Sequence, residues 1–291
     1  MPDNKYSLIE HLLFPPKRCD EKKLAATLTG KTVLITGASY GIGESLAFLL
    51  SKTGANLILV ARTKEKLEAV KNKIAAETAT ANVRIFPTDL TEDDEVKNLL
   101  NDLQNLPNGV DVFISNAGKS IRRPLFESLE RFHDYTRTMS LNYFAPVKLT
   151  LALVPILQKN RGHIISISAI NVLLIPAPFW TAYQSSKTAF DQWFRSAAPE
   201  LETAGIATTS VYLPLVRTRM IEPTAEYKDA PAMSPDHVAR IVCRTIYTRQ
   251  QTFKPWWLIF GQFASVVFRR PVENFMNSWT KRKLAGKSLK D

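Results

Sequence analysis

Two side chains four residues apart, Tyr183 and Lys187 in the stretch TAYQSSKT, are the best suited in this chain to acid–base chemistry. The pKa of a free phenol is about 10, which is too high for efficient proton transfer at neutral pH. A neighbouring ammonium group stabilises the phenolate and lowers that pKa. Because residues i and i+4 share one face of a helix, the spacing predicts a tyrosine proton donor that is tuned by the lysine.

A glycine-rich turn is the second feature with chemical potential. The segment GASYGIG follows a short apolar stretch at 31–36 and precedes a helical pattern that ends at Gly54. Glycines at positions 37, 41 and 43 let the backbone approach a ligand closely, and the first N–H groups of the helix attract a phosphate. A strand, a glycine turn and a helix in this order predict a pyrophosphate site.

The end of the second predicted strand indicates which dinucleotide would bind. A site that prefers NAD usually offers a carboxylate to the ribose hydroxyls at this point, but the chain reads VARTKEK, without an acid. Arg62 is placed to pair with a 2'-phosphate, helped by Thr63, Lys64 or Lys66, which favours NADP. The alternative is a solvated cluster of charges at the start of a helix.

The third and fourth predicted strands end on residues that fit the same cofactor site. Asp89 ends the third strand, where it would lie near the adenine, and the segment 116–118, Asn-Ala-Gly, ends the fourth and allows close approach to the cofactor. These positions follow from the rule that ligands of open α/β sheets bind beyond the carboxyl ends of the strands.

Strands and helices alternate along most of the chain. Apolar strands are predicted at 31–36, 56–61, 83–89, 110–118, 163–168 and 207–214, and helices at 64–77, 93–105, about 131–157 and around TAYQSSK. Strands that are apolar almost throughout are typical of a parallel sheet covered by helices on both faces. We therefore expect a doubly wound, Rossmann-type α/β/α fold in a single domain at 30–255, with an N-terminal extension at 1–29 and a C-terminal segment at 256–291.

Composition narrows the partners and the compartment. The 291 residues carry a net charge of +11, which attracts polyanions: nucleic acid, an anionic membrane surface or a ligand with several phosphates. No nucleic-acid-binding motif stands out, so nucleic acid is not an expected partner. Cys19 and Cys243 lie far apart in the sequence and fit neither a disulfide framework nor a metal site. A short apolar run near the N-terminus does not resemble a signal peptide, and we expect a cytoplasmic protein.

The C-terminal segment is aromatic and basic. Its apolar run from Trp256 to Phe268 has 13 residues, too few for a helix that spans a bilayer, which needs about 20. The basic residues that follow are Arg269, Arg270, Lys281, Arg282, Lys283, Lys287 and Lys290. This composition indicates either a peripheral contact with a membrane surface or a segment packed over the substrate cleft or in a subunit interface.

Taken together, TGASYGIG, NAG and YQSSK resemble the short-chain dehydrogenase/reductase superfamily over roughly residues 30–250. The resemblance implies hydride transfer between NAD(P) and a carbonyl carbon, with Tyr183 as acid/base and Lys187 lowering its pKa and holding the ribose. It also matches Asn142 to an asparagine that helps a proton-relay water. Leu215 departs from the family's usual glycine after Pro214, close to Thr218, which would contact the carboxamide. The predicted cofactor-binding residues are Gly37, Ser39, Tyr40, Gly41, Ile42, Gly43, Arg62, Asp89, Leu90, Asn116, Ala117, Gly118, Tyr183, Lys187, Pro214, Val216 and Thr218, with no metal.

One position departs from the family's pattern. The catalytic serine usually follows the fifth strand as the second of two serines, but in SISAI the corresponding residue is Ala169, and counting back from the tyrosine gives Ile170. Ser168 is the nearest hydroxyl, and it can serve only if the strand turns or bulges there. Loss of such a donor costs roughly 3 kcal/mol of transition-state stabilisation.

The stretch from Asn116 to Leu149, with PLVRTRMIEPT later, resembles more narrowly the reductases of this superfamily that act on long-chain fatty acyl-CoA. Arg122 and Arg123 would then meet the CoA phosphates, unless they pair with Glu127 or Glu130. Apolar residues at 173–180 and in the C-terminal segment would enclose the acyl chain, or pack in the core or an interface. The resemblance implies an NADPH-dependent reductase that forms a fatty aldehyde and assembles as a homo-oligomer. The alternatives are a lipid-like aldehyde, ketone or hydroxysteroid as substrate, or an NADP-binding sensor without turnover.

Overall fold

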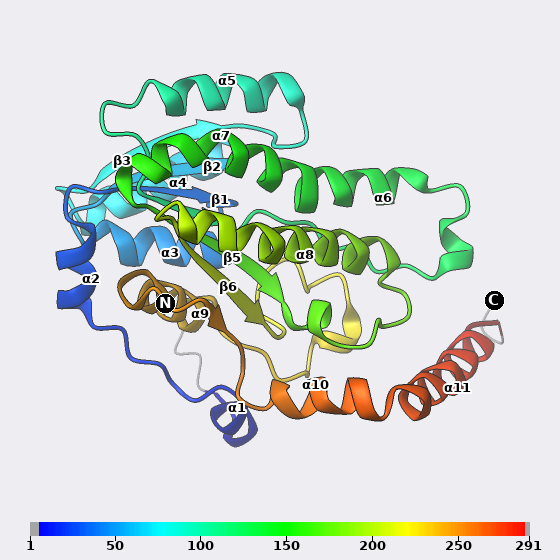
Figure 1. Cartoon of the computed structure of the whole chain (residues 1–291). Coiled ribbons are helices and arrows are strands. Elements are labelled where there is room, and N and C mark those ends of the chain that lie inside the picture. Colours follow the sequence, from blue (N-terminus) through cyan, green and yellow to red (C-terminus); the bar gives the residue numbers. More distant parts are fainter. Residues whose placement is uncertain (1–5, 289–291) are drawn as a thin grey trace.

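The protein is built on one parallel sheet of seven strands in the order β3-β2-β1-β4-β5-β6-β7, as seen in the computed structural model, which describes residues 6–288 (Figure 1). The strand order reverses at β1 and β4, where doubly wound folds bind their ligands. The predicted fold class is confirmed. The strands are β1 (Thr32–Thr36), β2 (Asn56–Ala61), β3 (Asn82–Pro87), β4 (Val112–Ser115), β5 (His163–Ala169), β6 (Ala207–Leu213) and β7 (Thr252–Phe253).

Helices cover both faces of the sheet (Figure 1). Neighbouring residues of β1 point to opposite faces, so that Val33 and Ile35 belong to one core and Leu34 to the other. The helices α2 (Glu21–Leu28), α3 (Gly41–Ser51), α4 (Lys64–Glu77) and α9 (Pro235–Thr248) pack on the first face, and α5 (Asp93–Gln104), α7 (Ala145–Asn160) and α8 (Thr181–Thr203) on the second. Burial of these apolar strands on both faces is why the sequence shows no alternation of polar residues.

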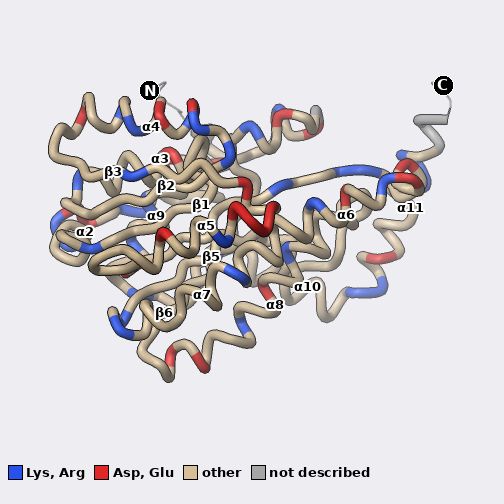
Figure 2. Tube along the Cα trace, turned by 90° about the horizontal axis from the view of Figure 1, so that it is seen from above, with Lys and Arg blue, Asp and Glu red and all other residues tan. Residues whose placement is uncertain are grey.

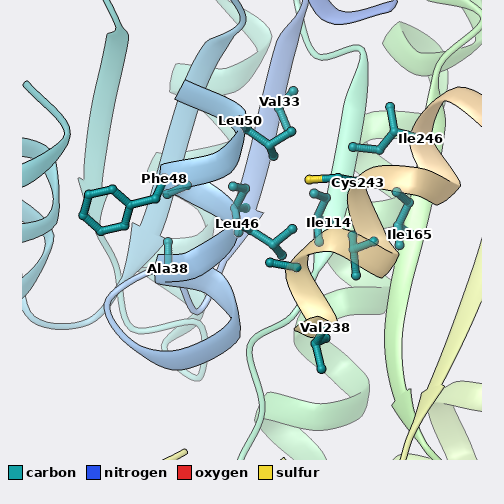
Figure 3. Packing of buried hydrophobic residues seen from close by; sticks show 14 of the residues in the cluster. Val33, Ala38, Leu46, Phe48, Leu50, Ile114, Ile165, Val238, Cys243 and Ile246 are labelled. Atoms are coloured by element: carbon teal, nitrogen blue, oxygen red, sulfur yellow. The ribbon is translucent and has the colours of Figure 1, made fainter. Parts of the chain in front are cut away.

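In the first core, α3 and α9 pack side by side on the same face of the sheet. Figure 3 shows Leu46 and Leu50 of α3 facing Val238, Cys243 and Ile246 of α9. Cys243 is fully buried, and its thiol hydrogen-bonds to Cys19, which lowers the pKa of Cys19. The fold therefore brings together two cysteines that the sequence separates, and both are free thiols.

The N-terminal extension packs onto the sheet domain. The short helix α1 (Leu8–Leu13) precedes α2, and Tyr6 at its start hydrogen-bonds through its hydroxyl to His237 Nδ1 at 3.0 Å. The same hydroxyl accepts from the backbone N–H of Ser234 at 2.8 Å. Residues 6–28 are therefore held against α9 rather than projecting from it.

The longest apolar helical stretch belongs to the core. It consists of α6 (Phe132–Met139), a π-helical turn (Ser140–Phe144) and α7. Among residues 6–288, this stretch is the one helix long and apolar enough to cross a membrane by length and composition. Its Leu149, Leu153 and Leu157 side chains are buried against the sheet, which accounts for the apolar composition.

The C-terminal helices α10 (Leu258–Val267) and α11 (Arg269–Ser288) extend as an arm along one side of the molecule (Figure 1). The arm lies against the loop that follows β5. A side chain at Gly261 would come within 3.2 Å of Leu174 in that loop, and the ring of Trp279 lies 5.8 Å from that of Phe179. Packing on the substrate side, one of the two expected arrangements, is therefore present for part of the segment.

Candidate active site

Backbone conformation and close packing in the turn leave room only for glycine at three positions. Gly37 and Gly41 have φ values of 67° and 60°, in the left-handed region. A Cβ on Gly37 would lie 2.9 Å from the Cα of Ala117, and one on Gly43 would lie 2.3 Å from the carbonyl oxygen of Gly37. Gly43 therefore serves the packing of α3 on the turn, whereas Gly37 lets the turn meet the end of β4.

Asn116 ties the same turn to the end of β4. Its side-chain amide donates to the carbonyl oxygens of Thr36 and Gly37, at 3.0 and 3.1 Å. Its backbone N–H donates to the Thr36 hydroxyl at 3.1 Å. The sequence predicts that Asn116 lies at a position where the backbone approaches the cofactor closely. The structure shows in addition that its side chain holds the glycine turn in place.

A cavity of about 470 Å³ lies beyond the carboxyl ends of the central strands. It is large enough for a small-molecule ligand. Gly43, Asp89 and Asn142 are the predicted site residues that do not line it. The predicted residues that do are Gly37, Ser39, Tyr40, Gly41, Ile42, Arg62, Leu90, Asn116, Ala117, Gly118, Ser168, Tyr183, Lys187, Pro214, Val216 and Thr218.

Basic residues gather where β2 ends. Arg62, Thr63 and Lys66 line the cavity, and the Arg62 side chain is 70% exposed, so it is accessible to a ligand. Its Nη1 lies 3.8 Å from a carboxylate oxygen of Asp89. Lys64, expected as an auxiliary, pairs instead with Glu68 at 3.8 Å.

Asp89 has a structural task at the start of α5. Its Oδ1 accepts from the backbone N–H and the hydroxyl of Thr91, at 2.9 and 2.7 Å. The carboxylate is thus turned toward its own loop. Its neighbour Leu90 and the preceding Thr88 line the cavity in its place.

Tyr183 and Lys187 lie on one helix, α8, and both line the cavity. Protein surrounds both, although part of each faces the cavity. Burial raises the pKa of Tyr183 to about 12 and lowers the pKa of Lys187 to about 8. The predicted lowering of the phenol's pKa is therefore wrong for this structure, because the desolvation of the phenolate outweighs any effect of the ammonium. Instead, the phenol is protonated at neutral pH and Lys187 remains mostly charged.

A buried carboxylate that the sequence did not single out lies one turn beyond the lysine. Asp191 is 4% exposed, and its charge raises the pKa of Lys187 against the effect of burial. Burial raises the pKa of Asp191 itself, whereas the hydroxyls of Tyr212 and Ser168 and the charge of Arg195 lower it. Its Oδ1 atom is buried without a hydrogen-bond partner. Asp191 therefore supports the charged form of Lys187 from below the cavity floor.

Ser168 does not meet the condition set for a catalytic role. It is 6% exposed, and β5 pairs with β6 residue by residue through Ser168↔Tyr212 and Ala169↔Leu213, without a bulge. Its hydroxyl interacts with Asp191 instead. The bulge expected for a catalytic Ser168 is thus not present, because a regular strand turns adjacent side chains to opposite faces. Ser168 nevertheless lines the cavity, and its catalytic role stays a prediction. Among the other uncharged polar residues that line the cavity, Ser120 and Asn171 were not predicted.

Asn142 is buried beneath the cavity in the π-helical turn, a feature frequent at functional sites. Its side-chain oxygen accepts from the backbone N–H of Lys119 at 2.8 Å, and its amide donates to the Lys119 carbonyl and to Ser186 Oγ, both at 2.9 Å. The side chain is therefore fully used in joining the segment after β4 to α8. Gly118 lies directly above it, since a Cβ there would come within 3.3 Å of both Asn142 Oδ1 and Lys187 Nζ.

The wall opposite the glycine turn is largely apolar and was mostly missed in the sequence. Trp180 stacks on Tyr227 with an interplanar angle of 10° and ring centroids 6.1 Å apart, and it also meets Tyr183 edge to face with centroids 5.7 Å apart. Leu215, at the position where the family usually has glycine, adds an apolar side chain to this wall. Tyr227 carried no local signal, because its role depends on the path of the loop after β6. The other apolar residues of this wall include Leu141, Ile170, Ala177, Met220 and Ile221.

The two arginines expected to meet CoA phosphates have protein partners. Arg123 donates through Nε to Asp134 at 3.0 Å, and Arg122 donates to Glu226 at 3.1 Å. Arg122 also lies over the ring of Phe179, at 5.4 Å from its centroid. These carboxylates differ from Glu127 and Glu130, which the sequence suggested as alternative partners of the two arginines. Lys283 of α11 shares Glu226 with Arg122, at 2.6 Å, which closes the arm onto the loop after β6.

Comparison with known proteins places this geometry among oxidoreductases. The family model described as short chain dehydrogenase matches residues 31–229. A fatty acyl-CoA reductase of Acinetobacter baylyi is 42% identical over 252 residues, 85% of this chain and 83% of the relative. A fatty acyl-CoA reductase of Mycobacterium tuberculosis is 39% identical over 229 residues, 78% of this chain and 77% of the relative. The crystal structure of a metagenomic short-chain oxidoreductase in complex with NADP superposes with a TM-score of 0.66 at 27% identity, covering 78% of this chain and 96% of that one.

Proposed function

The chain belongs to the short chain dehydrogenase family and is an oxidoreductase, and from this premise we propose that it uses NADPH to reduce a long-chain fatty acyl-CoA to a fatty aldehyde. The observation that carries the proposal is the position of Tyr183 and Lys187 in one cavity with the glycine turn. A nicotinamide cofactor bound on that turn supplies the hydride. The side chains hold the substrate carbonyl beside it and provide the proton.

Tyr183 is the proton donor in this proposal. Its pKa, raised to about 12, keeps the phenol protonated at neutral pH, yet the phenol is still a far stronger acid than the alcohol formed from a carbonyl. When the carbonyl carbon accepts a hydride, its oxygen takes the phenolic proton. With a thioester, this gives a hemithioacetal, whose hydroxyl loses its proton as the carbonyl re-forms and the carbon–sulfur bond breaks. The CoA sulfur takes up that proton and leaves as the thiol, so each turnover consumes one hydride and one proton overall.

Lys187 and Asn142 position the donor rather than transfer the proton themselves. Lys187 Nζ donates to the carbonyl oxygen of Ile167 at 3.1 Å, which fixes its ammonium at the end of β5. A charged lysine at this position stabilises the tyrosinate that remains after proton transfer. Because Lys187 lines the cavity, it could also hydrogen-bond the ribose of a bound cofactor. Asn142 joins the segment after β4 to α8, the helix that carries Tyr183 and Lys187.

NADP preference is assigned to Arg62. Its guanidinium is exposed at the cavity edge beside Thr63 and Lys66, and the Asp89 carboxylate that lies 3.8 Å away is occupied by Thr91. A planar guanidinium suits a 2'-phosphate, and a free carboxylate for the ribose hydroxyls is missing at the end of β2. The NADP complex of the structural relative supports the same cofactor.

The acyl-CoA substrate is supported by the relatives and by the apolar wall. Two relatives at 42% and 39% identity carry the name fatty acyl-CoA reductase. The aromatic and aliphatic side chains around Trp180 and Tyr227 offer the surface that an acyl chain needs, at about 0.8 kcal/mol for each buried CH2 group. A lipid-like aldehyde, ketone or hydroxysteroid would use the same wall and the same proton donor.

The test is NADPH oxidation by the purified protein with palmitoyl-CoA, a long-chain aldehyde and a hydrophobic ketone, followed by product identification. We expect turnover of palmitoyl-CoA with release of free thiol. Turnover of the aldehyde or ketone alone would replace the proposed substrate with the alternative. Tight NADPH binding without turnover of any carbonyl would indicate a sensor.

We also propose that the protein acts in the cytoplasm as a homo-oligomer and that residues 256–291 touch a membrane surface. Exposed apolar side chains on the outer face of the long core helix, Phe144 and Leu151, support an interface between copies. Light scattering that gives the monomer mass of 32.8 kDa at working concentration would reject the oligomer. Recovery of the full-length protein only in the supernatant after centrifugation with vesicles would reject the membrane contact.

A further inference from the structure

Two helices from opposite ends of the chain share one exposed apolar surface. Figure 1 shows α1 beside the start of α10, and the indole Nε1 of Trp256 donates to the carbonyl oxygen of Leu12 at 3.1 Å. On α1, Leu8 is 88% exposed, and on α10, Val266 is 78% exposed. We call this surface the α1–α10 face; its large exposed apolar residues are Leu8, Ile9, Leu12, Trp256, Ile259, Phe260, Phe263, Val266 and Val267.

Helix α1 is fixed with its apolar side outward. Glu10 is 5% exposed, forms an ion pair with the partly exposed Arg217 and accepts from the backbone N–H of Ala232 at 3.0 Å. Ser7 and Glu10 also form a reciprocal cap at the start of the helix. These contacts hold the pKa of Glu10 at about 2. A helix that turns its carboxylate inward and its leucines to solvent is the reverse of an ordinary surface helix, and it indicates an apolar partner.

The charges around the face have one sign. Residues 6–18 and 254–270, which the structure describes throughout, contain a single carboxylate, the buried Glu10. Helix α10 carries no charged residue, and in Figure 2 its trace is tan up to the basic residues at the start of α11. The five Lys and Arg residues of these two segments are Lys17, Arg18, Lys254, Arg269 and Arg270. Arg269 pairs with Glu273 at 2.9 Å.

A second cavity opens beside the same face. It has a volume of about 200 Å³ and is lined by Trp256, by apolar residues of the α1 segment and by three cations, Lys17, Arg244 and Lys254. The buried Nε2 atom of His237, which also lines it, has no hydrogen-bond partner, although the Pro15 carbonyl lies near the ring. Cations gathered at the border of an aromatic surface match the head groups of an anionic bilayer.

The face is also adjacent to the substrate wall of the active site. Gly261 of α10 packs on Leu174, and the loop that contains Leu174 continues to Trp180 in the main cavity. Trp279 of α11 covers Phe179 in the same loop. One layer of protein therefore separates the α1–α10 face from the side chains that would hold an acyl chain.

We propose that the α1–α10 face docks on an anionic lipid bilayer, with its apolar side chains in the head-group region and the surrounding cations on lipid phosphates. The proposal rests on the membrane contact assigned above to the C-terminal segment and extends it to α1, which the sequence did not connect with a membrane. An exposed apolar surface that is bordered by cations, with no exposed carboxylate in residues 6–18 and 254–270, favours an anionic bilayer over a protein partner of mixed charge.

The experiment measures sedimentation of the full-length protein with vesicles of phosphatidylcholine alone and with one third phosphatidylglycerol. We expect binding to the anionic vesicles, a loss of at least tenfold for Ile9→Glu/Leu12→Glu and a similar loss for Phe260→Glu/Phe263→Glu. The matched control is Phe126→Glu, which places the same charge on an exposed apolar residue of another loop and should leave binding unchanged. Circular dichroism and NADPH binding confirm that each variant is folded.

The outcomes separate this proposal from the ones it rests on. Loss of binding in the α10 variant but not in the α1 variant would leave a C-terminal membrane contact and overturn the shared face. A change of oligomeric mass in the α1 variant, with vesicle binding intact, would make the face an interface between copies. Sedimentation does not depend on turnover, so a failure of the acyl-CoA assay would leave this test unaffected.

The charge component has its own variant, Lys17→Gln/Lys254→Gln. Each cation near an anionic surface contributes about fivefold to partitioning, so we expect a loss of about 25-fold with anionic vesicles. Binding of the wild-type protein that is equally strong on phosphatidylcholine vesicles, or that survives 1 M salt without change, would contradict the assigned role of the cations.

Discussion

The two sides of the active-site cavity are held together by different kinds of contact. The cofactor side, from the glycine turn to the end of β4, is fixed by backbone contacts so close that a single added methyl group at Gly43 would overlap the Gly37 carbonyl oxygen, at 2.3 Å. The substrate side is formed by aromatic rings and ion pairs from distant segments, such as Phe179 with Trp279 and Glu226 with Lys283. Specific backbone geometry therefore defines one side, and adjustable side chains define the other.

This difference separates what the family shares from what an individual enzyme selects. A backbone that fits a pyrophosphate cannot vary without loss of the cofactor, whereas a wall of rings and flexible cations accepts new side chains at a modest energetic cost. Tyr183 and Lys187 stand where the two sides meet, on α8. We therefore expect substitutions at the junction to have the largest effects on activity. Those on the cofactor side should have smaller effects, and those on the substrate side smaller effects still.

The largest effect is expected at the junction. Tyr183→Phe removes the proton donor and should lower kcat by about a thousandfold, because general acid catalysis contributes roughly 10²- to 10⁴-fold. NADPH affinity, measured by fluorescence titration, should change less than threefold. Tyr227→Phe, which removes a second hydroxyl from the same cavity, is the control and should retain most activity. Comparable losses in both variants would argue against a unique donor.

On the cofactor side, Gly43→Ala should separate α3 from the glycine turn. The overlap of its Cβ with backbone atoms leaves no flexible side chain to yield, so we expect a loss of about 2 to 4 kcal/mol in the free energy of unfolding and a severe loss of NADPH affinity. Thermal and denaturant unfolding measure the first. Gly30→Ala is the control, because nothing lies within 4 Å of its Cβ and only its φ of +75° is strained. A variant as stable as wild type would refute the packing role.

The edge of the cofactor side should decide between the two dinucleotides. Arg62→Ala should weaken NADPH by about 20-fold and NADH by less than twofold, since a charge-assisted pair with a phosphate is worth about 1.5 to 3 kcal/mol. Isothermal titration with both cofactors gives the ratio. Lys64→Ala, which removes a cation that pairs with Glu68 outside the cavity, should change neither affinity. Equal losses for NADPH and NADH would remove the role assigned to Arg62.

The substrate side should tolerate change with smaller, substrate-dependent effects. Trp279→Ala uncovers Phe179 and should raise KM for a long-chain substrate by about three- to tenfold, with NADPH affinity unchanged, because part of the wall proposed to hold the acyl chain loses its support. Phe275→Ala on the same helix, whose ring is 70% exposed, is the control. If a short substrate suffered as much as a long one, Trp279 would not act through the acyl chain.

The smallest effect is a shift in pH dependence. Burial lowers the pKa of Lys187 to about 8, and the Asp191 charge opposes that lowering. Asp191→Asn removes the charge, so the pKa of Lys187 should fall further and the ammonium should be lost at a lower pH. The alkaline limb of kcat/KM should move to lower pH, with activity at pH 8 reduced about two- to threefold. A uniform loss of activity at all pH values would indicate a purely structural role.

Much of the cofactor side could be predicted from the sequence because its signals are local. Apolar strands, a glycine turn and a tyrosine–lysine pair are each contained within a few residues, and the structure places Gly37, Arg62 and Tyr183 in one cavity. The strand bounds agree within one or two residues for β1, β2, β5 and β6. The two-residue strand β7 is too short to produce a recognisable pattern.

The rest could not be predicted because it depends on distant contacts. Tyr227 and Asp191 acquire their roles from the loop and helix that pack beside them, and nothing in their neighbours marks them. The direction of the Tyr183 pKa shift depends on how deeply the phenol is buried, which a sequence does not state. The regular end of β5, which turns Ser168 toward Asp191, could likewise be known only from the pairing with β6.

The ion pair between Glu10 and Arg217 connects α1 to the loop after β6 that borders the main cavity. Arg217 lies between Val216 and Thr218, which both line the cavity, so α1 and the cavity share a single loop. If the proposed docking of α1 on a bilayer holds, thermodynamic reciprocity applies: whatever free energy a bound cofactor adds to lipid affinity, a bound bilayer must add to the affinity for the cofactor.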